Sequence, residues 1–290
     1  MFDFLKYRVM GLVFSFVLIG SLVGLYFYKG GLQYSVEFTG GTQIQFKFEK
    51  PMESKALLNA LTPTWPGAIA RKFTDTQILI RIPVGAHEGD ARGLADRARE
   101  TIQGNFADNP VTIEKSEVVG PGVGADLRWK SIYTVLLALL LMMLYIAFRF
   151  WSVAFAAGAV AALFHDVIIV LGLMLFFGRD ISINVIGAVL VVLAYSINDT
   201  IVIFSRMRAN IKKMSSASLY EIVNTSLNQT FKRTLLTSFS TVVAVGSMFA
   251  LGGEALRDLS VVILLGIFFG TYSSIYIASP TMMLLYKKEK

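Results

Sequence analysis

The chain has 290 residues, of which 54% are hydrophobic and only 16% are charged, and its formal net charge is +7. Soluble domains are nearer about 45–50% apolar and about 25% charged, so this composition argues against an ordinary soluble protein. Cysteine is absent, which excludes disulfides, thiolate catalysis and Cys-ligated metals, and the two histidines are too few for a His-rich metal site.

The positive charge is unevenly distributed along the chain. Residues 30–130 contain 12 Lys or Arg and 12 Asp or Glu, so the whole excess of +7 lies in the apolar remainder and its short loops. This distribution indicates membrane topology, because Lys and Arg collect in the cytoplasmic loops of membrane proteins. We therefore expect no nucleic acid among the partners.

The first apolar run covers residues 9–28, after Lys6 and Arg8 and before Lys29. It is longer than the about 7–15-residue apolar core of a secretory signal, and it ends in Tyr26, Phe27 and Tyr28. We predict an uncleaved span, with residues 1–29 forming a cytoplasmic N-terminus and the first transmembrane helix.

Residues 30–130 have a globular composition, and their hydrophobic residues alternate with polar ones. The predicted elements are, in chain order, a strand at 36–48, a helix at 53–61, strands at 69–73 and 77–82, a helix at 90–106 and a strand at 111–119. The order βαββαβ favours a small α+β, ferredoxin-like domain with helices on one face of its sheet. The Gly-rich residues 120–124 lack the ending of a phosphate loop, and we interpret them as the joint between domain and membrane.

Residues 131–290 contain five further apolar runs, each long enough to cross the hydrocarbon at 1.5 Å per residue. These runs are 131–148, 150–177, 181–204, 234–253 and 259–286. The polar segment 205–232 predicts a separate interfacial helix on the cytoplasmic side. The fold class is therefore an α-helical polytopic membrane protein with six transmembrane helices plus a small α+β extracytoplasmic domain.

The short loops predict the orientation of the chain. One side carries Lys6, Arg8, Arg149, the basic residues of 206–233 and the tail residues Lys287, Lys288 and Lys290. The opposite loops pair Arg179 with Asp180, and Arg257 with Glu254 and Asp258. We expect both termini in the cytoplasm and residues 30–130 in the periplasm or outside the cell.

Ionisable side chains inside the predicted spans are few: Asp166 next to His165, Asp199 next to Asn198, and Arg233. A central Asp or Arg costs about 2.5–3.5 kcal/mol on insertion scales, and such residues tend to mark ion or proton routes. In the fourth span, Tyr195, Asn198 and Asp199 share one broad face. For the His165–Asp166 pair, an interhelical hydrogen bond explains the sequence equally well.

The fifth span carries a polar stripe that begins at Arg233 and continues through Thr237, Ser240, Thr241, Ala244 and Ser247. Small and hydroxyl residues are also what close helix packing uses, so the hydroxyls alone fit a proton path and a packing face equally well. Asp199 and Arg233 together favour the proton path. We interpret Gly266, Gly270, Ser273 and Ser274 in the sixth span as packing residues.

Nucleotide-binding and hydrolase motifs are absent from the sequence: there is no Walker loop, HExxH or GxSxG. We therefore expect no enzymatic activity, no cofactor and no metal.

Five motifs occur together in chain order: residues 36–42 (VEFTGGT), 119–124 (VGPGVG), 162–167 (ALFHDV), 195–202 (YSINDTIV) and 233–238 (RTLLTS). With these motifs the chain resembles the SecF family, the protein-export membrane subunits that pair with SecD. Glu37 stands where the family usually has Asp before Phe-Thr-Gly-Gly, and Ser205 where Asp-Arg is frequent after the fourth span.

The resemblance implies a fold related to the resistance-nodulation-division transporters and a role in which the proton-motive force promotes preprotein translocation across the bacterial cytoplasmic (inner) membrane. It assigns Asp199 and Arg233 to the proton pathway, with Asn198, Thr237 and Ser238 as supporting polar groups and Asp166 as a further candidate. The implied partners are SecD on a separate polypeptide, the SecYEG translocon, possible YajC, the unfolded preprotein and membrane lipids.

Two other classes of protein fit parts of the sequence. One is half of a proton-coupled efflux transporter for small molecules or lipids, which the polar stripe and the fold analogy suggest. The other is a non-catalytic membrane scaffold, for which a charge-balanced exterior domain and small-residue helix faces are sufficient.

Overall fold

The computed structural model describes residues 1–83 and 93–286, and the chain forms two compact units. The first unit contains residues 1–33 and 133–290, and the second contains residues 34–132. Helix α5 (Pro121–Phe150) begins in the second unit and continues into the first.

The second unit is built around a four-stranded antiparallel sheet in the order β2-β3-β1-β4. Its elements are α2 (Val36–Thr39), β1 (Gly41–Phe48), α3 (Ser54–Leu61), β2 (Ile69–Lys72), β3 (Gln77–Ile82), α4 (Gly93–Asn105) and β4 (Val111–Val119). The two central strands pair in register, with Ile44 opposite Ile80. This βαββαβ arrangement confirms the predicted ferredoxin-like domain.

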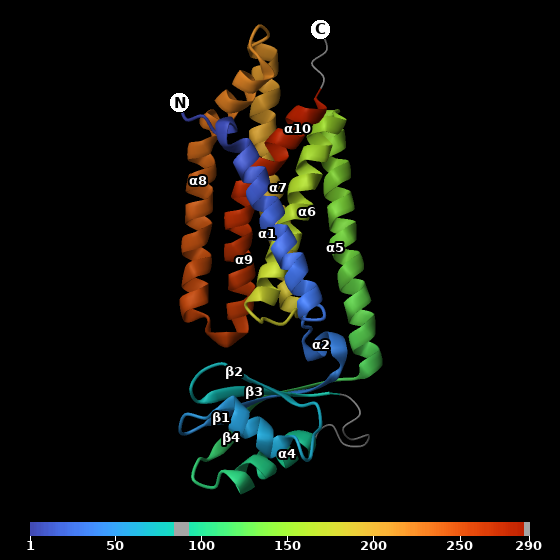
Figure 1. The fold of residues 1–290 in the computed structure, drawn as a ribbon, viewed down its shortest axis with the longest axis vertical. Helices are drawn as coiled ribbons and strands as arrows, with labels where there is room; N and C mark the ends of the chain where they lie inside the picture. The colour runs from blue at the N-terminus through green and yellow to red at the C-terminus, as the bar shows by residue number, and fades with distance from the viewer. Residues whose placement is uncertain (84–92, 287–290) are drawn as a thin grey trace. The chain divides into compact units, whose positions relative to one another are not determined.

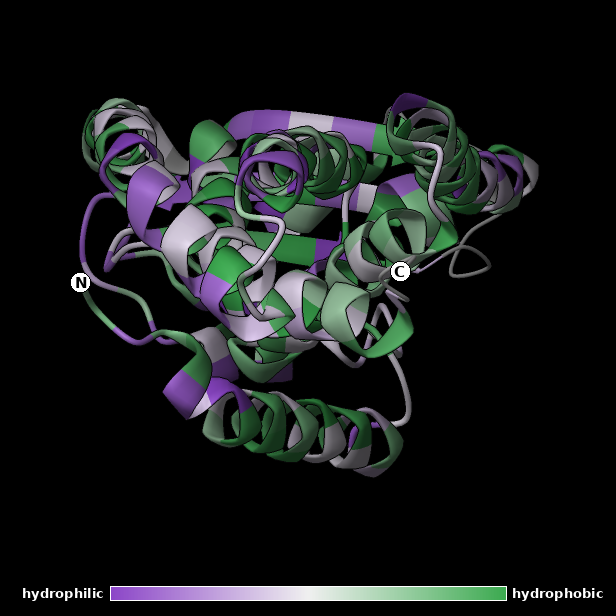
Figure 2. Cartoon of the chain, turned by 90° about the horizontal axis from the view of Figure 1, so that it is seen from above, coloured by the Kyte–Doolittle hydropathy of each residue, from purple (hydrophilic) through white to green (hydrophobic). Residues whose placement is uncertain are grey.

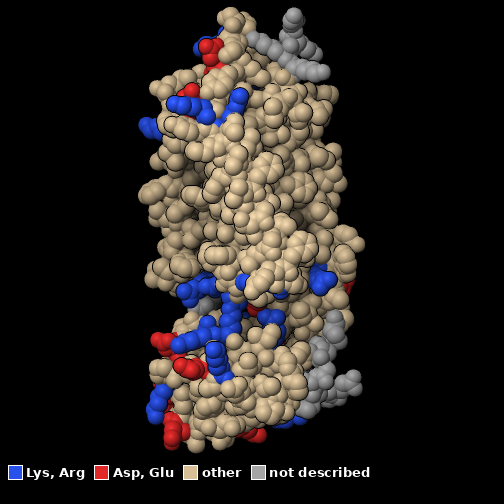
Figure 3. Space-filling view, in the orientation of Figure 1, with Lys and Arg blue, Asp and Glu red and all other residues tan. Residues whose placement is uncertain are grey.

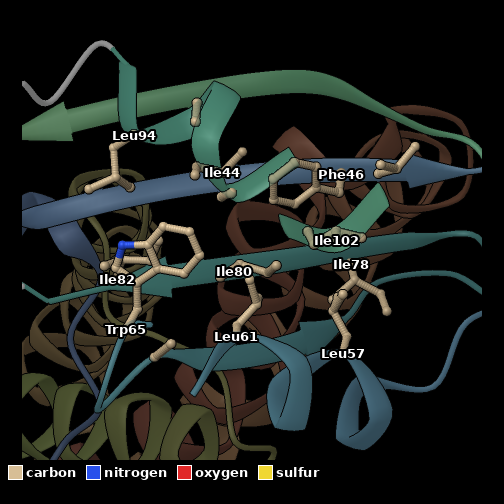
Figure 4. Close-up of a cluster of buried hydrophobic side chains, with 14 of the residues drawn as sticks. Ile44, Phe46, Leu57, Leu61, Trp65, Ile78, Ile80, Ile82, Leu94 and Ile102 are labelled. Atoms are coloured by element: carbon tan, nitrogen blue, oxygen red, sulfur yellow. The ribbon is translucent and has the colours of Figure 1, made fainter. Parts of the chain in front are cut away.

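One face of the sheet carries the core of the second unit. In β1 the side chains of Ile44, Phe46 and Phe48 are buried, because alternate residues of a strand point to the same face. Leucines of α3 and Ile102 of α4 cover these strand residues, and Trp65 closes one end of the cluster (Figure 4). The domain therefore has an apolar core of its own.

Residues 36–39 differ from the expected strand, because they form the short helix α2. The chain leaves this turn through Gly40 (φ 73°) and Gly41 (φ 122°), which are backbone conformations that other residues rarely adopt. A Cβ at Gly41 would lie 2.5 Å from the backbone oxygen of Ile82 in β3. The alternating pattern predicted a strand across these residues and did not show this break. Of the expected helix at 90–106, residues 90–92 lie outside the described residues.

The first unit is a helical bundle, and its spans lie side by side in Figure 1. Its elements are η1 (Leu5–Tyr7), α1 (Arg8–Tyr28), α6 (Val153–Phe176), α7 (Ile183–Lys213), α8 (Leu219–Leu251), α9 (Gly253–Ser273), η2 (Ser274–Ala278) and α10 (Ser279–Leu285), together with most of α5. In the described residues six helices are long and apolar enough to cross a membrane, the last formed by α9, η2 and α10. These spans confirm the predicted count, and Figure 2, a view from above, shows green hydrophobic stretches in the helices.

The bundle has a buried centre and an exposed periphery. Helix α9 lies against α6, α7 and α8, and α6 also lies against α1 and α10. By contrast, α1, α5 and α8 expose many large apolar side chains, such as Phe16, Leu141 and Phe239. On the face drawn in Figure 3 the middle of the bundle shows no Lys, Arg, Asp or Glu. An apolar outer surface of this kind suits contact with lipid or with other membrane helices.

The prediction of a separate interfacial helix at 205–232 is wrong. Helix α7 continues to Lys213 and α8 already begins at Leu219, so the polar segment forms the ends of two long helices. Ser218 and Glu221 form a capping box that starts α8. Asn210 of α7 donates a hydrogen bond to Ser226 of α8 at 2.8 Å. These polar residues therefore hold the two helices of a hairpin, α7 and α8, together.

Candidate functional site

Asp199 is the central residue of the expected proton pathway. It lies in α7 with 3% of its surface exposed. The hydroxyl of Thr271, in α9, lies 3.5 Å from Asp199 Oδ2, which is a long hydrogen bond. Helix packing thus holds this carboxylate between α7 and α9, where Thr271 is its one hydroxyl donor among the described residues.

A chain of hydroxyl groups leads away from Asp199 through three helices. Thr271 Oγ1 lies 3.0 Å from Ser238 Oγ of α8, and the hydroxyl of Tyr195 in α7 donates to Ser238 Oγ at 3.0 Å. Each of these hydroxyls both donates and accepts hydrogen bonds. The order Tyr195–Ser238–Thr271–Asp199 can therefore conduct a proton by reversing the direction of its hydrogen bonds. We call these four residues the hydroxyl chain.

Arg233 lies on an exposed part of α8. Its positive charge acts on Asp199, although no ion pair within 4.0 Å joins the two residues in the described part of the chain. The pair is thus close enough for electrostatic coupling without direct contact.

The other expected polar groups lie in different places. Asn198 is exposed, because adjacent residues of a helix point about 100° apart. Thr237 is also exposed, and its hydroxyl donates to the backbone oxygens of Arg233 and Thr234 in its own helix. Ser238 alone of these supporting residues belongs to the hydroxyl chain. Residues Asn198 and Thr237 face the surface of the bundle.

Asp166 belongs to a second cluster. It lies in α6 with 0% exposure, and its Oδ2 accepts hydrogen bonds from Ser196 of α7 at 2.5 Å and from Ser273 of α9 at 2.8 Å. Its Oδ1 lies 2.9 Å from Nδ1 of His165. The interhelical hydrogen bond that the sequence left open is therefore present, and it joins three helices.

The sequence analysis missed several members of these two clusters. Thr271, Ser196 and Ser15 were not singled out, and Ser273 was interpreted as a packing residue. A detectable signal was the hydroxyl content of the sixth apolar span, because polar groups in a span need a partner inside the protein. The glycine interpretation fits the structure, since a Cβ at Gly266 would lie 2.0 Å from Val192 of α7.

Among the described residues, no group of three or more His, Cys, Asp or Glu side chains could hold a metal ion.

Two family models match the chain. The model described as protein export membrane protein SecD/SecF, C-terminal, matches residues 99–288, and the model of the SecD/SecF GG motif matches residues 27–52. The second match contains the Gly40–Gly41 turn. Together the two matches include both units of the fold.

Curated relatives match over nearly the whole chain. The protein translocase subunit SecF of Pseudomonas aeruginosa is 37% identical over 286 residues, which is 98% of this chain and 91% of the relative. SecF of Rhodothermus marinus is 38% identical, with 97% of this chain and 92% of the relative covered. The SecDF protein of Thermus thermophilus is 37% identical, and the match covers 92% of this chain but 36% of that protein.

The fold also matches solved structures. A crystal structure of SecDF, a translocon-associated membrane protein from Thermus thermophilus, aligns with a TM-score of 0.87 at 35% identity, covering 98% of this chain and 38% of that chain. SecDF in a super-membrane-facing form aligns with a TM-score of 0.71 at the same identity and coverage. The relatives named SecF are translocase subunits, which is a non-enzymatic role. Together with these relatives, the six long apolar helices of this chain show that it is a multi-pass membrane protein. By sequence, fold and motifs, the chain belongs to the SecD/SecF family of protein-export membrane proteins, as a member of its SecF branch.

Proposed function

We propose that this chain works with SecD as a proton-driven subunit of the Sec protein-export machinery and promotes preprotein translocation. Membership of the SecF family supports the export role. The observation that supports proton coupling is the placement of Asp199, a buried carboxylate that the hydroxyl chain joins to α8 and α9. Asp199 and Arg233 would form the proton site.

One proton on Asp199 would change the packing of α7 and α8. When Asp199 is ionised, the positive charge of Arg233 attracts it; when Asp199 is protonated, that attraction is lost. A unit charge that crosses a membrane potential of 100 mV gains about 2.3 kcal/mol. This energy is comparable with that of a few interhelical hydrogen bonds, which are worth about 0.6 kcal/mol on average, so one proton is enough to shift a helix interface.

Motion of this kind agrees with the structures of the relatives. This chain aligns with one SecDF structure at a TM-score of 0.87 and with another at 0.71. The two SecDF structures therefore differ in shape over the matched part. We propose that proton binding at Asp199 drives a similar change here and so moves the domain of residues 30–130 that contacts the unfolded preprotein.

Pairing with SecD is supported by the surface of the bundle. Asn198, Arg233 and Thr237 are exposed in membrane-spanning helices, where contact with lipid would leave a charge and an amide without partners. A polar face of another membrane protein would satisfy them. The fused SecDF relative carries both names in one protein. SecYEG and YajC are further proposed partners, together with the surrounding lipids.

We propose that both termini lie in the cytoplasm of a bacterial cell and that residues 30–130 lie outside its inner membrane. The backbone N–H groups of Phe2 and Phe4 donate to Asn228 and Asn224 of α8 at 2.8 and 2.9 Å. The N-terminal segment therefore lies at the same end of the bundle as the basic α7–α8 hairpin, and α10 ends there too (Figure 1). Basic residues favour the cytoplasmic side. The domain boundaries 1–29, 30–130 and 131–290 belong to this proposal.

The decisive experiment is the variant Asp199→Asn in a reconstituted complex with SecD and the translocon. Asparagine keeps the size of the side chain and its ability to accept from Thr271, but it cannot take up a proton. We expect loss of the part of preprotein export that an imposed proton gradient stimulates, with basal export and co-purification of the complex unchanged. Stimulation equal to that of the unmodified protein would refute the proton role.

Ser240→Ala is the matched control. The hydroxyl of Ser240 lies on the same helix as Arg233, and its only hydrogen bond among the described residues is to the backbone oxygen of Leu236, so gradient-stimulated export should persist. When a protonophore collapses the gradient, export by the Ser240→Ala complex should fall to the rate measured for the Asp199→Asn complex. A change in drug susceptibility with unchanged export would instead favour an efflux transporter.

A further inference from the structure

The cluster around Asp166 extends to a fourth helix. Nε2 of His165 lies 2.9 Å from Ser15 Oγ in α1, and Ser15 Oγ lies 3.1 Å from the hydroxyl of Tyr272 in α9. That tyrosine hydroxyl donates to the backbone oxygen of Gly11 at 2.6 Å. The result is an unbroken line of contacts from Gly11 through Tyr272, Ser15 and His165 to Asp166.

Counting hydrogens along this line shows that it is one proton short when Asp166 is ionised and His165 is neutral. Four contacts join the five groups. Tyrosine, serine and neutral histidine each supply one donor hydrogen, which makes three, and an ionised carboxylate supplies none. A buried contact between two oxygen or nitrogen atoms without a hydrogen between them is unfavourable. A fourth hydrogen is needed to fill the line.

The direction of the bonds locates that hydrogen. Since Tyr272 donates to Gly11, the only hydrogen left for the Ser15–Tyr272 contact is that of Ser15. The oxygen of Ser15 must then accept from Nε2 of His165, so the histidine carries a hydrogen on Nε2. The remaining contact, between Nδ1 of His165 and Oδ1 of Asp166, receives the additional proton. Oδ2 of Asp166 is already occupied by the hydroxyls of Ser196 and Ser273.

We propose that His165 and Asp166 form a second proton-binding site, distinct from Asp199, which holds one proton between Nδ1 of the imidazole and Oδ1 of the carboxylate. The two side chains are 4% and 0% exposed. The proton can lie on either atom, as a neutral pair or as an imidazolium and carboxylate. In both cases Nε2 of His165 is protonated and the pair as a whole is uncharged, which suits its burial.

Among the described residues, the groups that contact the pair carry no charge, although α7 also carries the buried Asp199, three residues beyond Ser196. The groups that contact the pair are Ser15 of α1, Ser196 of α7, and Tyr272 and Ser273 of α9, and the ring of Tyr272 stacks on His165 at 5.9 Å. Against the same helix, η2 contributes Tyr276 as its only ionisable side chain and α10 contributes none. In the described residues the only ion-pair contact of Asp166 is with His165. Thus no Lys or Arg within ion-pair distance neutralises Asp166 in place of the bound proton.

A route for exchange lies at the other end of the line. Tyr272 and Gly11 line a cavity of about 490 Å³ together with Tyr7, Met10, Phe14 and Tyr276. Tyr7, Met10 and Phe14 are exposed at the surface of the bundle. In this proposal a proton enters at Tyr272 and reaches the histidine through Ser15 by successive reversal of hydrogen bonds.

Loss of the proton would change the contact between α1 and α9. The histidine would then donate from Nδ1 to the carboxylate, and Ser15 would have to turn its hydrogen towards Nε2. That change removes the only hydrogen between Ser15 and Tyr272. The proton on the His165–Asp166 pair is therefore coupled to the joint between α1 and α9, and its contribution to export rests on the proposed function above.

Solid-state NMR of ¹⁵N-labelled histidine tests the site directly, on the full chain in complex with SecD in lipid. The sequence has only two histidines, so His87→Gln leaves His165 as the single ring signal. We expect a protonated Nε2 at neutral pH, and as the pH rises a shift of the Nε2 signal to that of an unprotonated ring nitrogen. An unprotonated Nε2 at neutral pH, or a spectrum that does not change over the pH range in which the complex stays folded, would overturn the proposal.

Asp166→Asn is the matched variant, because the amide can donate to Nδ1 while its oxygen accepts from Ser196 and Ser273. It should keep Nε2 protonated at every pH and abolish the titration. A titration identical to that of the unmodified chain would contradict the assignment to Asp166. These readouts do not depend on export: if Asp199→Asn exports normally, the proton-driven function fails while the NMR result for His165 stands.

Discussion

Substitution of Gly41 by alanine tests why the chain needs a glycine pair between α2 and β1. Gly41 has a φ of 122°, and a Cβ there would lie 2.5 Å from the backbone oxygen of Ile82. Backbone strain of this kind costs of order 1–3 kcal/mol, and forcing a methyl group into a filled space costs about 1–3 kcal/mol more. Because Gly41 is the first residue of β1, fraying of the strand end relieves part of this strain, and we expect a net loss of about 2–4 kcal/mol in the domain.

Hydrogen exchange on the intact protein in lipid nanodiscs measures this loss. At about 1.4 kcal/mol per tenfold change, protection of the β1 and β3 amides should fall by roughly 30- to 1,000-fold. The control is Gly104→Ala in α4, where a Cβ meets no atom within 4 Å, and alanine there should stabilise the helix by up to about 1 kcal/mol. Unchanged protection in Gly41→Ala would refute the steric reasoning and would favour a binding role for the glycine pair.

Two further substitutions test the packing and the electrostatics. Gly266→Ala places a methyl group 2.0 Å from Val192 between α7 and α9, so it should lower the stability in detergent by about 1–3 kcal/mol. The control Gly246→Ala has open space around it and should leave the stability unchanged. Equal melting curves for the two variants would contradict close helix contact at Gly266. In the second unit, the ammonium of Lys72 lies 2.7 Å from the carboxylate of Asp75 and holds the pKa of Asp75 below its ordinary value of 3.8. A lowered folded-state pKa stabilises the fold above the unfolded pKa and loses that effect as the pH falls through the folded pKa. Lys72→Gln should therefore raise the pKa of Asp75 towards the ordinary value in an NMR titration and reduce the acid dependence of stability, and an unmoved titration would argue against the pair.

The regular elements were predictable from the chain because they depend on local patterns. Continuous apolar runs of sufficient length predicted six spans, and alternating residues such as Ile44, Phe46 and Phe48 predicted a strand with one buried face. The helix at 36–39 was missed because two glycines with positive φ interrupt a pattern that otherwise alternates. The interfacial helix was wrong because polar residues in 205–232 mark where helices leave the membrane, and their polarity does not require a new helix.

The sequence by itself determined the class of the protein, the number of spans and the short set of ionisable residues within the spans, since each follows from hydropathy and from motifs read along the chain. Only the tertiary structure decided which polar groups meet. Asn198 and Asp199 are neighbours in sequence, yet one is exposed and the other is buried against α9, because the helix turns by about 100° per residue. Ser15, Ser196 and Ser273 converge on the His165–Asp166 pair from three other helices. Their meeting depends on how each helix is rotated against the others, and this rotation is set by packing contacts between residues far apart in the chain.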